Sequence, residues 1–549
     1  MTLDRLRYDL RWRSAPALTQ QAARRFGDEL ALVDGTHRRT FIELAADVRA
    51  ATAAAMAAGI RSGDRVAIWA PNSGTWLTAA LGAQGAGAVL VPVNTRFKAG
   101  EAAHVLRTSR ARFLFTVNGF LGTDYESMLL DSGEELPDLG VVVVMDGPAI
   151  GPHTRTWVAY LRDGQSVPQA ELLAAIDAVE PDDVADIIFT SGTTGRPKGV
   201  LTTHGQNLRC FGVYTKAIGL RRGDRYLIVN PFFHCFGYKA GFLACLMRGA
   251  TILPVAVFDP KRIIEMVAAH RITVLPGPPT LLQSLLEEDG AAADLSSLRL
   301  TVTGAAEIPV ELIRRLRAQR VFDTVLTAYG LTESSGLVSV SRPDDPPEVI
   351  ARWSGQVIDG VEVRIVDESG EPLPPGELGE ILVRGFNVMR CYLDDPAATA
   401  AAIDEYRWLR TGDLGIADAE GRLRIAGRKK DMFIVGGFNA YPAEIEDILL
   451  GHEGIARVAV VGVPDGRLGE IGAAFVVARH GASLDTDGLI AWARERMANF
   501  KVPRHVHVLD ALPMNATGKV DKLLLAEWAA TRHVDDTGGQ GMTDSRSGV

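Results

Sequence analysis

The sequence contains few cysteines, and none of them forms a CxxC pair. Among 549 residues the cysteines are Cys210, Cys235, Cys245 and Cys391. Their dispersion matches no zinc-binding or dithiol motif, so metal or redox chemistry at sulfur is not indicated. Thiols this sparse in a long chain fit a reducing compartment, and we expect each of them to pack in the core.

Long apolar runs and an excess of positive charge are also missing. No stretch reaches the roughly 18 consecutive apolar residues that a membrane helix needs. The N-terminal segment lacks the continuous apolar centre of a signal peptide. Lys plus Arg number 58 against 67 for Asp plus Glu, which gives a formal net charge of −9. This balance argues against a chain that coats nucleic acid or an anionic membrane. Because no signal peptide or membrane helix is indicated, we expect no integral membrane association and a location in the cytoplasm.

The chain instead has length and an alternation of two kinds of segment. Its 549 residues suffice for two or more domains. Nearly continuous apolar runs predict strands covered on both faces, at residues 65–69, 88–93, 113–117, 141–145, 186–190, 225–230, 272–275 and 298–303. Helical patterns, such as those at 260–270 and 278–288, alternate with them. This alternation predicts α/β layers with parallel sheets.

The pattern changes after residue 361. Two runs, VEVRIVD and GELGEILVRG, predict antiparallel strands joined by Gly and Pro turns. Strands at 456–463 and 473–478, followed by a helix at 486–496, predict a small α+β domain. Residues 533–549 are rich in Gly, Asp and Ser, and predict a disordered tail.

The segment TSGTTGRPKGV, at residues 190–200, carries the strongest chemical signal. Its glycines let backbone N–H groups turn toward one point, its hydroxyls add donors, and Lys198 adds a cation. The segment therefore predicts a cradle for phosphate oxygens, although a Gly/Thr-rich loop alone is also compatible with a plain turn. It is not a Walker A loop, because Gly199 follows Lys198 and the glycine spacing differs.

The full string resembles the phosphate-binding signature of the adenylate-forming (ANL) superfamily, which includes acyl-CoA synthetases, adenylation domains and luciferases. Further motifs of that superfamily follow in order: PFFHCFG at 231–237, TGAAE at 303–307, YGLTE at 329–333, RTGDLG at 410–415, GRKKDMFIVGGFNAYPAEIE at 427–446 and PMNATGK at 513–519. The resemblance implies a large N-terminal AMP-binding domain over residues 1–429, built of layered α/β sheets with a β-barrel-like subdomain. A small, mobile α+β catalytic domain over 430–532 would follow.

The resemblance also implies which residues bind ATP. The phosphate cradle would comprise Thr190, Ser191, Gly192, Thr193, Thr194, Gly195 and Lys198, with Thr332 offering a further hydroxyl. The adenine would lie between the aromatic face of Tyr329 and the turn formed by Gly304, Ala305 and Ala306. Gly330, next to Tyr329, would also contact the nucleotide. Glu333 and Thr190 are expected to bind Mg²⁺. Asp413 is expected to bind the ribose, and Arg428, which is close to it in sequence, is expected to support the ribose or the phosphate.

Lys519, at the end of the last motif, matches the catalytic lysine of the superfamily. An ammonium there would offset the repulsion that arises when an acid carboxylate attacks the α-phosphate of ATP. Lys430 matches the hinge position about which the small domain would rotate. After that rotation, Gly436 and Gly437 would let the pantetheine arm of coenzyme A pass close to the backbone.

The acid pocket is expected beside His234, which the resemblance implies is a catalytic or gating residue of the acyl site. Phe236, Gly237 and Lys239 would extend its lining. The alternative for a histidine in an apolar run is a core residue whose hydrogen bonds are satisfied within the fold.

The predicted activity is ATP-dependent acid–CoA ligation through an acyl-adenylate, with ATP, Mg²⁺ and coenzyme A as reactants. Within the superfamily the chain is most similar to ligases of bacterial sterol catabolism that activate a hexahydroindanedione propanoate. The segments NPFFHCFGYKAGFLACL, HRITVLPGPPTLLQSLL and DLSSLRLTVTGAAEIPV carry this likeness. Their glycines and alanines would leave room for a ring system, but a medium- or long-chain fatty acid would fit as well.

Three other functions stay open at this point. They are an acyl-AMP ligase serving a separate carrier protein, a luciferase-like monooxygenase and a non-catalytic sensor. A sensor is disfavoured because Glu333, Asp413 and Lys519 are all present. Free coenzyme A is favoured as the acceptor, and a homodimer is a compatible assembly.

Overall fold

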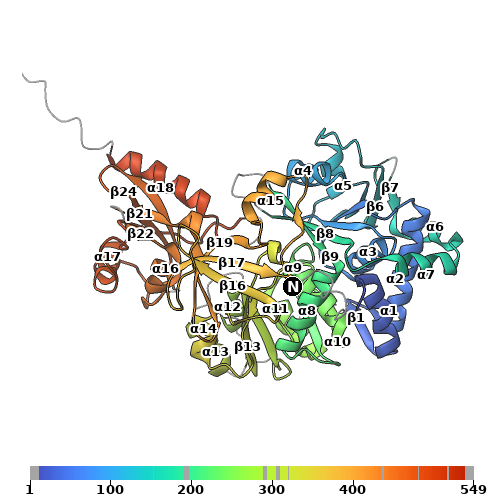
Figure 1. Cartoon of the computed structure of the whole chain (residues 1–549), viewed down its shortest axis with the longest axis horizontal. Helices are drawn as coiled ribbons and strands as arrows, with labels where there is room; N and C mark the ends of the chain where they lie inside the picture. Colours follow the sequence, from blue (N-terminus) through green and yellow to red (C-terminus); the bar gives the residue numbers. More distant parts are fainter. Residues whose placement is uncertain are drawn as a thin grey trace, which may run out of the picture. The chain divides into compact units, whose positions relative to one another are not determined.

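The structure, a computed structural model, describes residues 12–151, 154–190, 197–287, 294–304, 310–318, 321–435, 438–479, 481–515 and 519–537. The chain divides into two compact units (Figure 1). The first comprises residues 1–364, 382–411 and 417–424, and the second comprises 365–381, 412–416 and 425–549. The predicted domain boundary between residues 429 and 430 lies inside the second unit and stays a prediction.

An eight-stranded sheet forms the centre of one half of the first unit. Its strand order is β18-β9-β8-β4-β3-β5-β6-β7. The strands are β3 (Arg65–Trp69), β4 (Val89–Pro92), β5 (Phe113–Val117), β6 (Val141–Asp146), β7 (Thr154–Thr156), β8 (Val184–Thr190), β9 (Lys198–Thr203) and β18 (Cys391–Tyr392). The strands from β8 to β7 along this order pair in parallel, as the apolar runs predicted, whereas β9 pairs antiparallel with β8.

Two apolar helices pack closely beside this sheet. Helix α3 (Gly74–Gly85) contacts β3 and β4, and helix α2 (Phe41–Ala57) packs against α3. A Cβ on Gly82 would lie 2.4 Å from the Cβ of Ala51, and one on Gly85 would lie 2.3 Å from Oγ1 of Thr52. The two glycines therefore allow the close approach of the helices, and the apolar sequence of α3 is buried along its whole length.

The other half of the first unit contains two further sheets. Their orders are β10-β11-β1-β2 and β12-β13-β14-β15. The strands are β1 (Leu30–Asp34), β2 (His37–Thr40), β10 (Arg225–Ile228), β11 (Thr251–Pro254), β12 (Leu300–Gly304), β13 (Thr324–Tyr329), β14 (Ser339–Val340) and β15 (Gln356–Val357). The pairs β10–β11 and β12–β13 are parallel.

The strand predicted at residues 272–275 is not formed as such. Only Val274 makes β-bridges, to Tyr226 in β10 and to Leu300 in β12. The apolar run is buried between these two strands, but Pro276 follows it and has no N–H to continue a ladder. Burial was therefore predicted correctly, and regular strand structure was not.

The remaining helices of the first unit surround these sheets. They include α1 (Ala15–Phe26), α4 (Ala99–Ser109), α5 (Tyr125–Leu130), α6 (Trp157–Asp163), α7 (Gln169–Ala178), α8 (His204–Ala217), α10 (Ala244–Arg248), α11 (Pro260–His270), α12 (Pro279–Glu287), α13 (Val310–Ala318), α14 (Pro347–Arg352) and α15 (Pro396–Ala402). Helix α11 has the bounds that the sequence predicted, because Asp259 caps its first turn and Pro260 begins it.

A separate four-stranded sheet has the order β16-β17-β19-β20. Its strands are β16 (Val361–Val366), β17 (Gly379–Gly385), β19 (Leu409–Ala417) and β20 (Leu423–Arg428). The two runs VEVRIVD and GELGEILVRG supply β16 and β17, so the predicted change of texture after residue 361 is confirmed.

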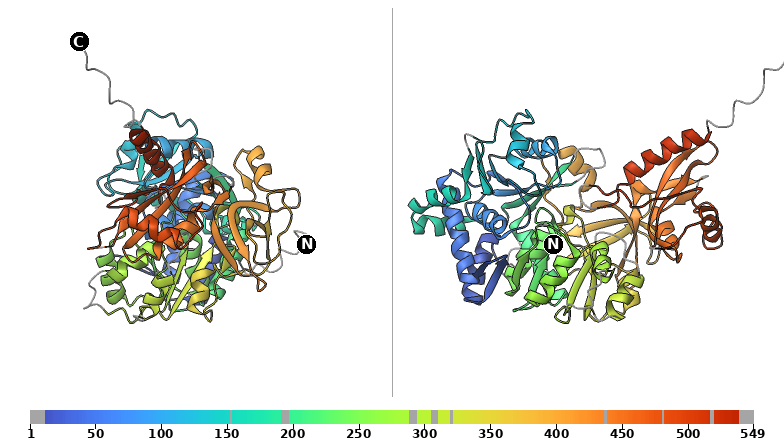
Figure 2. Two further views of the ribbon diagram at one scale, coloured as in Figure 1. Left: turned by 90° about the vertical axis from the view of Figure 1, so that its left-hand side faces the viewer. Right: turned by 180° about the vertical axis from the view of Figure 1, so that it is seen from behind.

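The C-terminal part of the second unit is a small α+β fold, as predicted. Strands β21 (Phe433–Val435), β22 (Phe438–Ala440), β23 (Ile455–Asp465), β24 (Gly469–Ala478) and β25 (His505–Val508) form its sheet. Helices α16 (Pro442–Leu450) and α17 (Thr486–Arg494) precede α18 (Lys522–Thr537), which packs on β23 (Figure 2). The residue His533, where the disordered tail was predicted to begin, lies inside α18, and residues 538–549 are outside the described residues.

Alternate residues of β23 and β24 face two different cores. Val460 and Val476 belong to one core, whereas Val461 and Phe475 belong to the other. This alternation follows from the two-residue repeat of a strand and explains why these strands carry long apolar runs.

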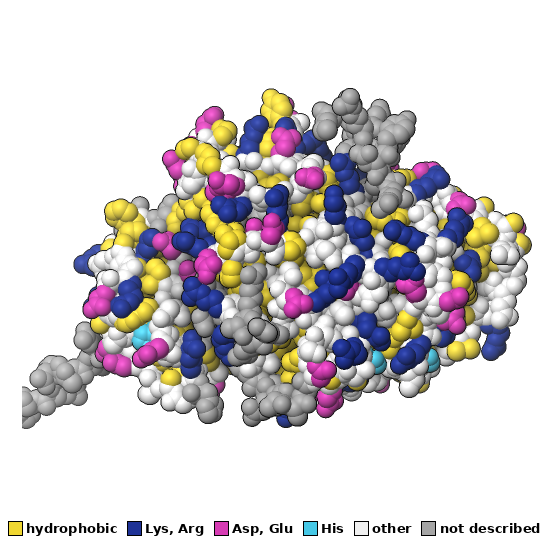
Figure 3. All heavy atoms as spheres, turned by 90° about the horizontal axis from the view of Figure 1, so that it is seen from below, with side chains coloured by type: hydrophobic (Ala, Val, Ile, Leu, Met, Phe, Trp, Pro, Cys, Tyr) yellow, Lys and Arg dark blue, Asp and Glu magenta, His cyan; other side chains and the backbone are white. Residues whose placement is uncertain are grey.

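The surface carries charges of both signs. On the face shown in Figure 3, Lys and Arg side chains are interspersed with Asp and Glu. None of the described helices has the length and apolar character to cross a membrane. Cys210, Cys235 and Cys245 are free and buried, as expected, and Cys391 is free and half-buried.

Candidate active site

The predicted phosphate cradle connects the two strands of a hairpin. Thr190, the last residue of β8, pairs with Lys198, the first residue of β9. Ser191, Gly192, Thr193, Thr194 and Gly195 lie outside the described residues. The structure therefore places the two ends of the cradle, one with a hydroxyl and the other with an ammonium.

A tyrosine that the sequence motifs did not include lies beside this hairpin. Tyr392 in β18 pairs with Val200 of β9, and its ring centroid is 5.3 Å from the Nζ atom of Lys198. Its hydroxyl donates a hydrogen bond of 2.9 Å to Oε1 of Glu333. Tyr392 thus joins the lysine of the cradle to the carboxylate predicted to bind Mg²⁺.

Glu333 is held by a tight turn. It lies in the 3-10 helix η4 (Thr332–Ser334), which is closed by a hydrogen bond from Ser334 N to the Leu331 carbonyl. The Glu333 carbonyl accepts a 2.7 Å bond from the backbone N–H of Met389. Both the backbone and the side chain of Glu333 are therefore oriented before any ion binds.

The residues predicted to hold the adenine lie at one edge of a sheet. Gly304 ends β12 and Tyr329 ends β13, and these parallel strands pair Gly304 with Ala328. Ligands of α/β proteins bind beyond the carboxyl ends of parallel strands, which is where both residues lie. A Cβ on Gly330 would be 2.4 Å from the Gly336 carbonyl oxygen, so that position needs glycine. Ala305 and Ala306 are outside the described residues.

His234 precedes a short helix and is exposed. It lies next to α9 (Cys235–Gly237), which continues into the π-helix η3 (Tyr238–Leu243). A hydrogen bond joins the side chain of Cys235, the neighbour of His234 in sequence, to Thr332 of the predicted phosphate site. Burial raises the pKa of the Cys235 thiol, against the attraction of Lys239, which makes a nucleophilic role unsuitable.

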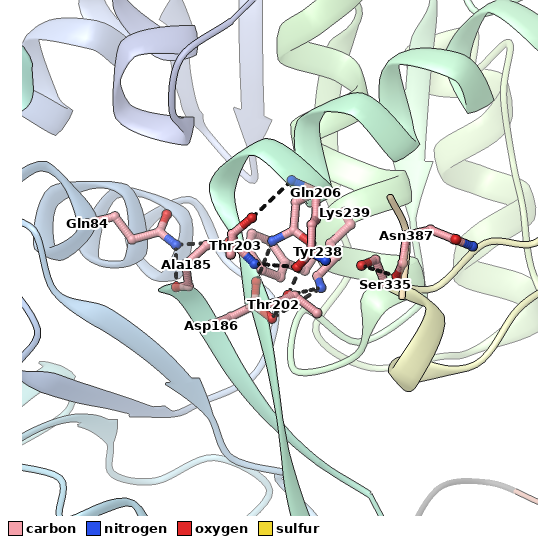
Figure 4. Close-up of polar contacts among 11 residues, drawn as sticks. Gln84, Ala185, Asp186, Thr202, Thr203, Gln206, Tyr238, Lys239, Ser335 and Asn387 are labelled. Carbon is pink, nitrogen blue, oxygen red and sulfur yellow. Dashed lines mark hydrogen bonds and ion pairs between the residues drawn. The ribbon is translucent and has the colours of Figure 1, made fainter. Parts of the chain in front are cut away.

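Lys239 does not line a pocket, contrary to the expectation from the sequence. Its side chain is 0% exposed, and its Nζ atom lies 3.1 Å from Oδ1 of Asp186, which is also 0% exposed. Figure 4 shows these two side chains and Thr202 pointing toward one another. No pattern in the sequence indicated this pair, because a lysine is usually a surface residue and the two residues lie 53 positions apart.

Two glycines near His234 do not border open space, contrary to the expectation that small residues there leave room for a ring system. A Cβ on Gly237 would be 2.2 Å from the Pro231 carbonyl oxygen, and one on Gly241 would be 3.2 Å from two carbon atoms of Ile228. These glycines permit close packing of backbone and side chains. They do not provide space for a ring-shaped acid.

In the second unit, the predicted ribose residues are in contact. Nε of Arg428, at the end of β20, lies 2.7 Å from Oδ1 of Asp413 in β19. The Asp413 side chain is 5% exposed and that of Arg428 is 44% exposed, so the carboxylate is fixed while the guanidinium reaches solvent. Lys429 forms a similar pair, with its Nζ atom 3.2 Å from Oε2 of Glu380.

Lys430 and Lys519 are both exposed in this unit. Lys430 is in the 3-10 helix η5 (Lys429–Asp431), directly after the two residues that bind carboxylates. The backbone N–H of Lys519 donates to Oδ1 of Asn515 over 3.0 Å, and its carbonyl accepts from Asn515 N over 2.7 Å. This turn presents the Lys519 side chain to solvent, while Gly436 and Gly437 are outside the described residues.

Two family models match the chain in consecutive parts. That of the AMP-binding enzymes matches residues 19–393, and that of the AMP-binding enzyme C-terminal domain matches residues 444–519. The chain belongs to the AMP-binding enzyme family. The first of these matches ends one residue beyond β18, and thus includes the hairpin, Glu333 and Tyr392.

Relatives within the AMP-binding enzyme family narrow the class. A Rhodococcus jostii protein named 3-[(3aS,4S,7aS)-7a-methyl-1,5-dioxo-octahydro-1H-inden-4-yl]propanoyl:CoA ligase is 47% identical, over 94% of this chain and 98% of that protein. A Mycobacterium tuberculosis protein of the same name is 48% identical, over 94% and 99%. An anthranilate CoA ligase in complex with anthranoyl-AMP is 26% identical, with a TM-score of 0.84 over 95% of this chain and 98% of that chain. The predicted fold and the predicted class, an AMP-forming acid–CoA ligase, are thereby confirmed.

Proposed function

We propose that this AMP-binding enzyme joins coenzyme A to a propanoate carried on a hexahydroindane-dione ring system, using ATP and Mg²⁺. The observation that carries the proposal is the identity of 47% and 48%, over almost the whole length of each protein, to two ligases named for that acyl group. A medium-chain fatty-acid–CoA ligase of Escherichia coli is 34% identical. A fatty acid is therefore the weaker alternative.

In the first half-reaction, a carboxylate oxygen of the acid attacks the α-phosphorus of ATP. The bond from that phosphorus to the β-bridging oxygen breaks, and pyrophosphate leaves with the electron pair. Thr190 and Lys198 would hold the departing phosphates, and Lys519 would offset the charge that collects at the α-phosphate. The exposed position of Lys519, on a turn that Asn515 closes, supports this role.

Glu333 fits a magnesium site. Mg²⁺ is commonly bound by one or two carboxylates together with phosphate oxygens and water, and the hydrogen bond from Tyr392 orients the Glu333 carboxylate for such a ligand set. Thr190 would add its hydroxyl. When bound, the ion would neutralise charge on the phosphates of ATP.

The adenine and the ribose of ATP each have their own candidate residues. Gly304 and Tyr329 provide a flat surface and an aromatic ring at the sheet edge for the adenine, with Gly330 beside them. Asp413 would accept hydrogen bonds from the ribose hydroxyls, and its pairing with Arg428 supports this role by keeping the carboxylate charged and oriented.

In the second half-reaction, the thiol of coenzyme A attacks the carbonyl carbon of the acyl-adenylate, and AMP leaves. Lys430 would be the hinge between the two reactions, and Gly436 and Gly437 would border the pantetheine path. The position of Lys430 supports the hinge, because the two residues before it are anchored to Asp413 and Glu380. His234 would gate the acid site.

The activity is tested by measuring acid-dependent AMP formation with and without coenzyme A. The proposal expects slow AMP release from ATP and the ring propanoate alone, and fast release once coenzyme A is added. No AMP with any acid would indicate a sensor. AMP formation that coenzyme A does not accelerate, but an acyl carrier protein does, would indicate a carrier-directed ligase. Oxygen-dependent light emission with a luciferin would indicate a monooxygenase.

We also propose a cytoplasmic location and a homodimeric assembly. Four free thiols in the described structure support the cytoplasm. A homodimer stays a prediction, which sedimentation of the purified protein would test.

A further inference from the structure

A buried ion pair connects the hairpin of the phosphate cradle to the segment around His234. Asp186 lies in β8, four residues before Thr190, and Lys239 lies in the π-helix that follows Cys235–Gly237. The Lys239 ammonium contacts Oδ1 of Asp186 at 3.1 Å, and both side chains are 0% exposed. Two elements that the proposed function uses for different substrates are thus joined by one interaction.

The pair is completed by side chains of the same hairpin and of helix α8. Thr202 is the register partner of Asp186 in β9, and its hydroxyl donates to Oδ1 of Asp186 over 2.7 Å. That hydroxyl also accepts from Lys239 Nζ over 2.9 Å. Asn207 in α8 donates to Oδ2 of Asp186 over 2.6 Å. Both carboxylate oxygens are therefore occupied, and both strands of the hairpin are held (Figure 4).

The network also reaches the turn that carries Glu333. Gln206, next to Asn207, donates to the Val388 carbonyl over 2.6 Å. The adjacent Asn387 accepts a 2.8 Å hydrogen bond from Ser335 at its carbonyl oxygen. Ser335 follows the 3-10 helix of Glu333, with φ of 58°. Figure 4 shows Gln206 beside the hairpin, and Ser335 and Asn387 together to one side of it.

Burial affects both the charge of Lys239 and the net stability that this ion pair contributes. By itself burial lowers the pKa of Lys239, but the attraction of and hydrogen bond to Asp186, together with the attraction of Cys235 and Cys210, raise the pKa above its usual value. Lysine is therefore charged here. A buried ion pair commonly adds little net stability compared with apolar residues of similar volume, whereas it does fix which groups lie opposite one another. A π-helix, which supplies Lys239, is also frequent at functional sites.

We propose that the Asp186–Lys239 pair is a positioning device, which holds the phosphate-cradle hairpin in register with the His234 segment and so sets the rate of acid adenylation. Neither residue touches a substrate in this account; both act through Thr190 and Lys198 at the ends of the cradle. The inference rests on the proposed function of that cradle. Displacement of a reacting group by about 1 Å costs roughly 100-fold in rate, so a small shift of the hairpin is sufficient.

The decisive variant replaces both charges with apolar residues. Lys239→Met alone leaves a buried carboxylate uncompensated and is expected to lower the melting temperature. The double variant Asp186→Leu/Lys239→Met removes both charges and is expected to recover most of that loss. If the pair only stabilised the fold, activity would recover as well. We expect instead that kcat for acid-dependent ATP–pyrophosphate exchange stays lower than wild type by roughly 100-fold.

The structure offers a matched control. Arg299 and Asp224 form another ion pair with little exposure, 17% and 2% for the two side chains. Arg299 immediately precedes β12 and Asp224 immediately precedes β10, at the strand ends opposite to Gly304. The double variant Asp224→Leu/Arg299→Met is expected to keep kcat within about threefold of wild type below its melting temperature.

A milder pair of variants covers the case in which the double variant fails to fold. Thr202→Val keeps the shape of the side chain but removes the hydroxyl between Asp186 and Lys239, and Thr202→Ser keeps the hydroxyl. We expect roughly tenfold slower exchange for Thr202→Val, and near-normal exchange for Thr202→Ser. Equal rates for these two variants, at equal melting temperatures, would contradict the proposal.

Hydrogen–deuterium exchange provides a readout that needs no substrate. Amides of residues 184–190 and 197–203 are expected to exchange faster in the Asp186→Leu/Lys239→Met variant than in wild type or in the Asp224→Leu/Arg299→Met control. Unchanged exchange there, with kcat equal to that of the control, would overturn the inference. An inactive wild-type enzyme would instead count against the proposed function, and the amide exchange would still decide the positioning role.

Discussion

The hydroxyl of Tyr392 donates a hydrogen bond of 2.9 Å to the carboxylate of Glu333, across 59 positions of sequence. The same ring lies 5.3 Å from the ammonium of Lys198. One tyrosine therefore contacts both the proposed magnesium ligand and the cation of the phosphate segment. Its role is to orient these groups, and it is absent from the motifs by which the site was predicted.

Tyr392→Phe tests the orientation of Glu333. Loss of the hydrogen bond is expected to raise the Mg²⁺ concentration for half-maximal adenylation by roughly 10–100-fold, the usual effect of removing a partner of a metal ligand. The measurement is a Mg²⁺ titration of ATP–pyrophosphate exchange. Tyr406→Phe is the control, because Tyr406 is 67% exposed. An unchanged Mg²⁺ requirement in Tyr392→Phe would show that Glu333 needs no such partner.

Asp413→Asn tests the ribose site. The wild-type enzyme is expected to prefer ATP over 2′-deoxy-ATP by roughly tenfold or more, because a charged hydrogen bond to the 2′-hydroxyl is lost with the deoxynucleotide. The variant should lose most of this preference and show a higher KM for ATP. Asp418→Asn, in the turn after β19, should keep the preference. If Asp413→Asn retains full discrimination, the ribose lies elsewhere.

Lys519→Ala tests the division of labour between the half-reactions. Adenylation should fall by roughly 100–1,000-fold, as for other losses of a charge-stabilising group. The melting temperature should not change, because Lys519 is exposed. The variant should still convert preformed acyl-adenylate and coenzyme A to the thioester. Lys261→Ala, at an exposed position of α11, is the control, and near-normal pyrophosphate release by Lys519→Ala would remove Lys519 from the mechanism.

The buried side chain of His204 makes the stability of the fold depend on pH. Burial lowers the pKa of His204 from 6.5 to about 3. Below pH 6.5 the unfolded chain binds a proton that the folded chain does not, so stability is present above pH 6.5 and is lost as the pH falls toward 3. The loss is about 1.4 kcal/mol per pH unit in that window. Between pH 7.5 and 5, the melting temperature should fall more in wild type than in His204→Gln, whereas exposed His37→Gln should behave as wild type. Equal slopes for wild type and His204→Gln would contradict this.

The parts of the fold that the sequence predicted are those with local causes. The strand at Phe113–Val117 is a continuous apolar run, and it pairs with strands on both sides as such runs do. Helix α11 begins at Pro260 after a capping aspartate. The apolar run at 272–275 is buried but does not form a regular strand. Apolar content predicts burial, whereas the hydrogen bonds of a β-ladder also need the backbone N–H that Pro276 lacks.

The predicted parts of the site are those within motifs. Asp413 and Arg428 were both expected to bind the nucleotide, and they form an ion pair. Tyr392 and Asp186 were missed because their partners, Glu333 and Lys239, are distant in sequence. Such pairs of side chains depend on the arrangement of strands in the fold, and no local sequence pattern predicts them. The role of Gly237 was also misjudged, because a small residue can serve close packing as readily as ligand space.

The most direct test of the proposed function is the rate of acyl-CoA formation across a panel of acids. The panel should contain the hexahydroindane-dione propanoate, octanoate, palmitate and a hydroxycinnamate, assayed at equal enzyme, ATP, Mg²⁺ and coenzyme A concentrations. We predict that kcat/KM for the ring propanoate exceeds that for every other acid by about 100-fold or more, a ratio that corresponds to a few lost pocket contacts. A higher kcat/KM for octanoate or palmitate than for the ring propanoate would contradict it.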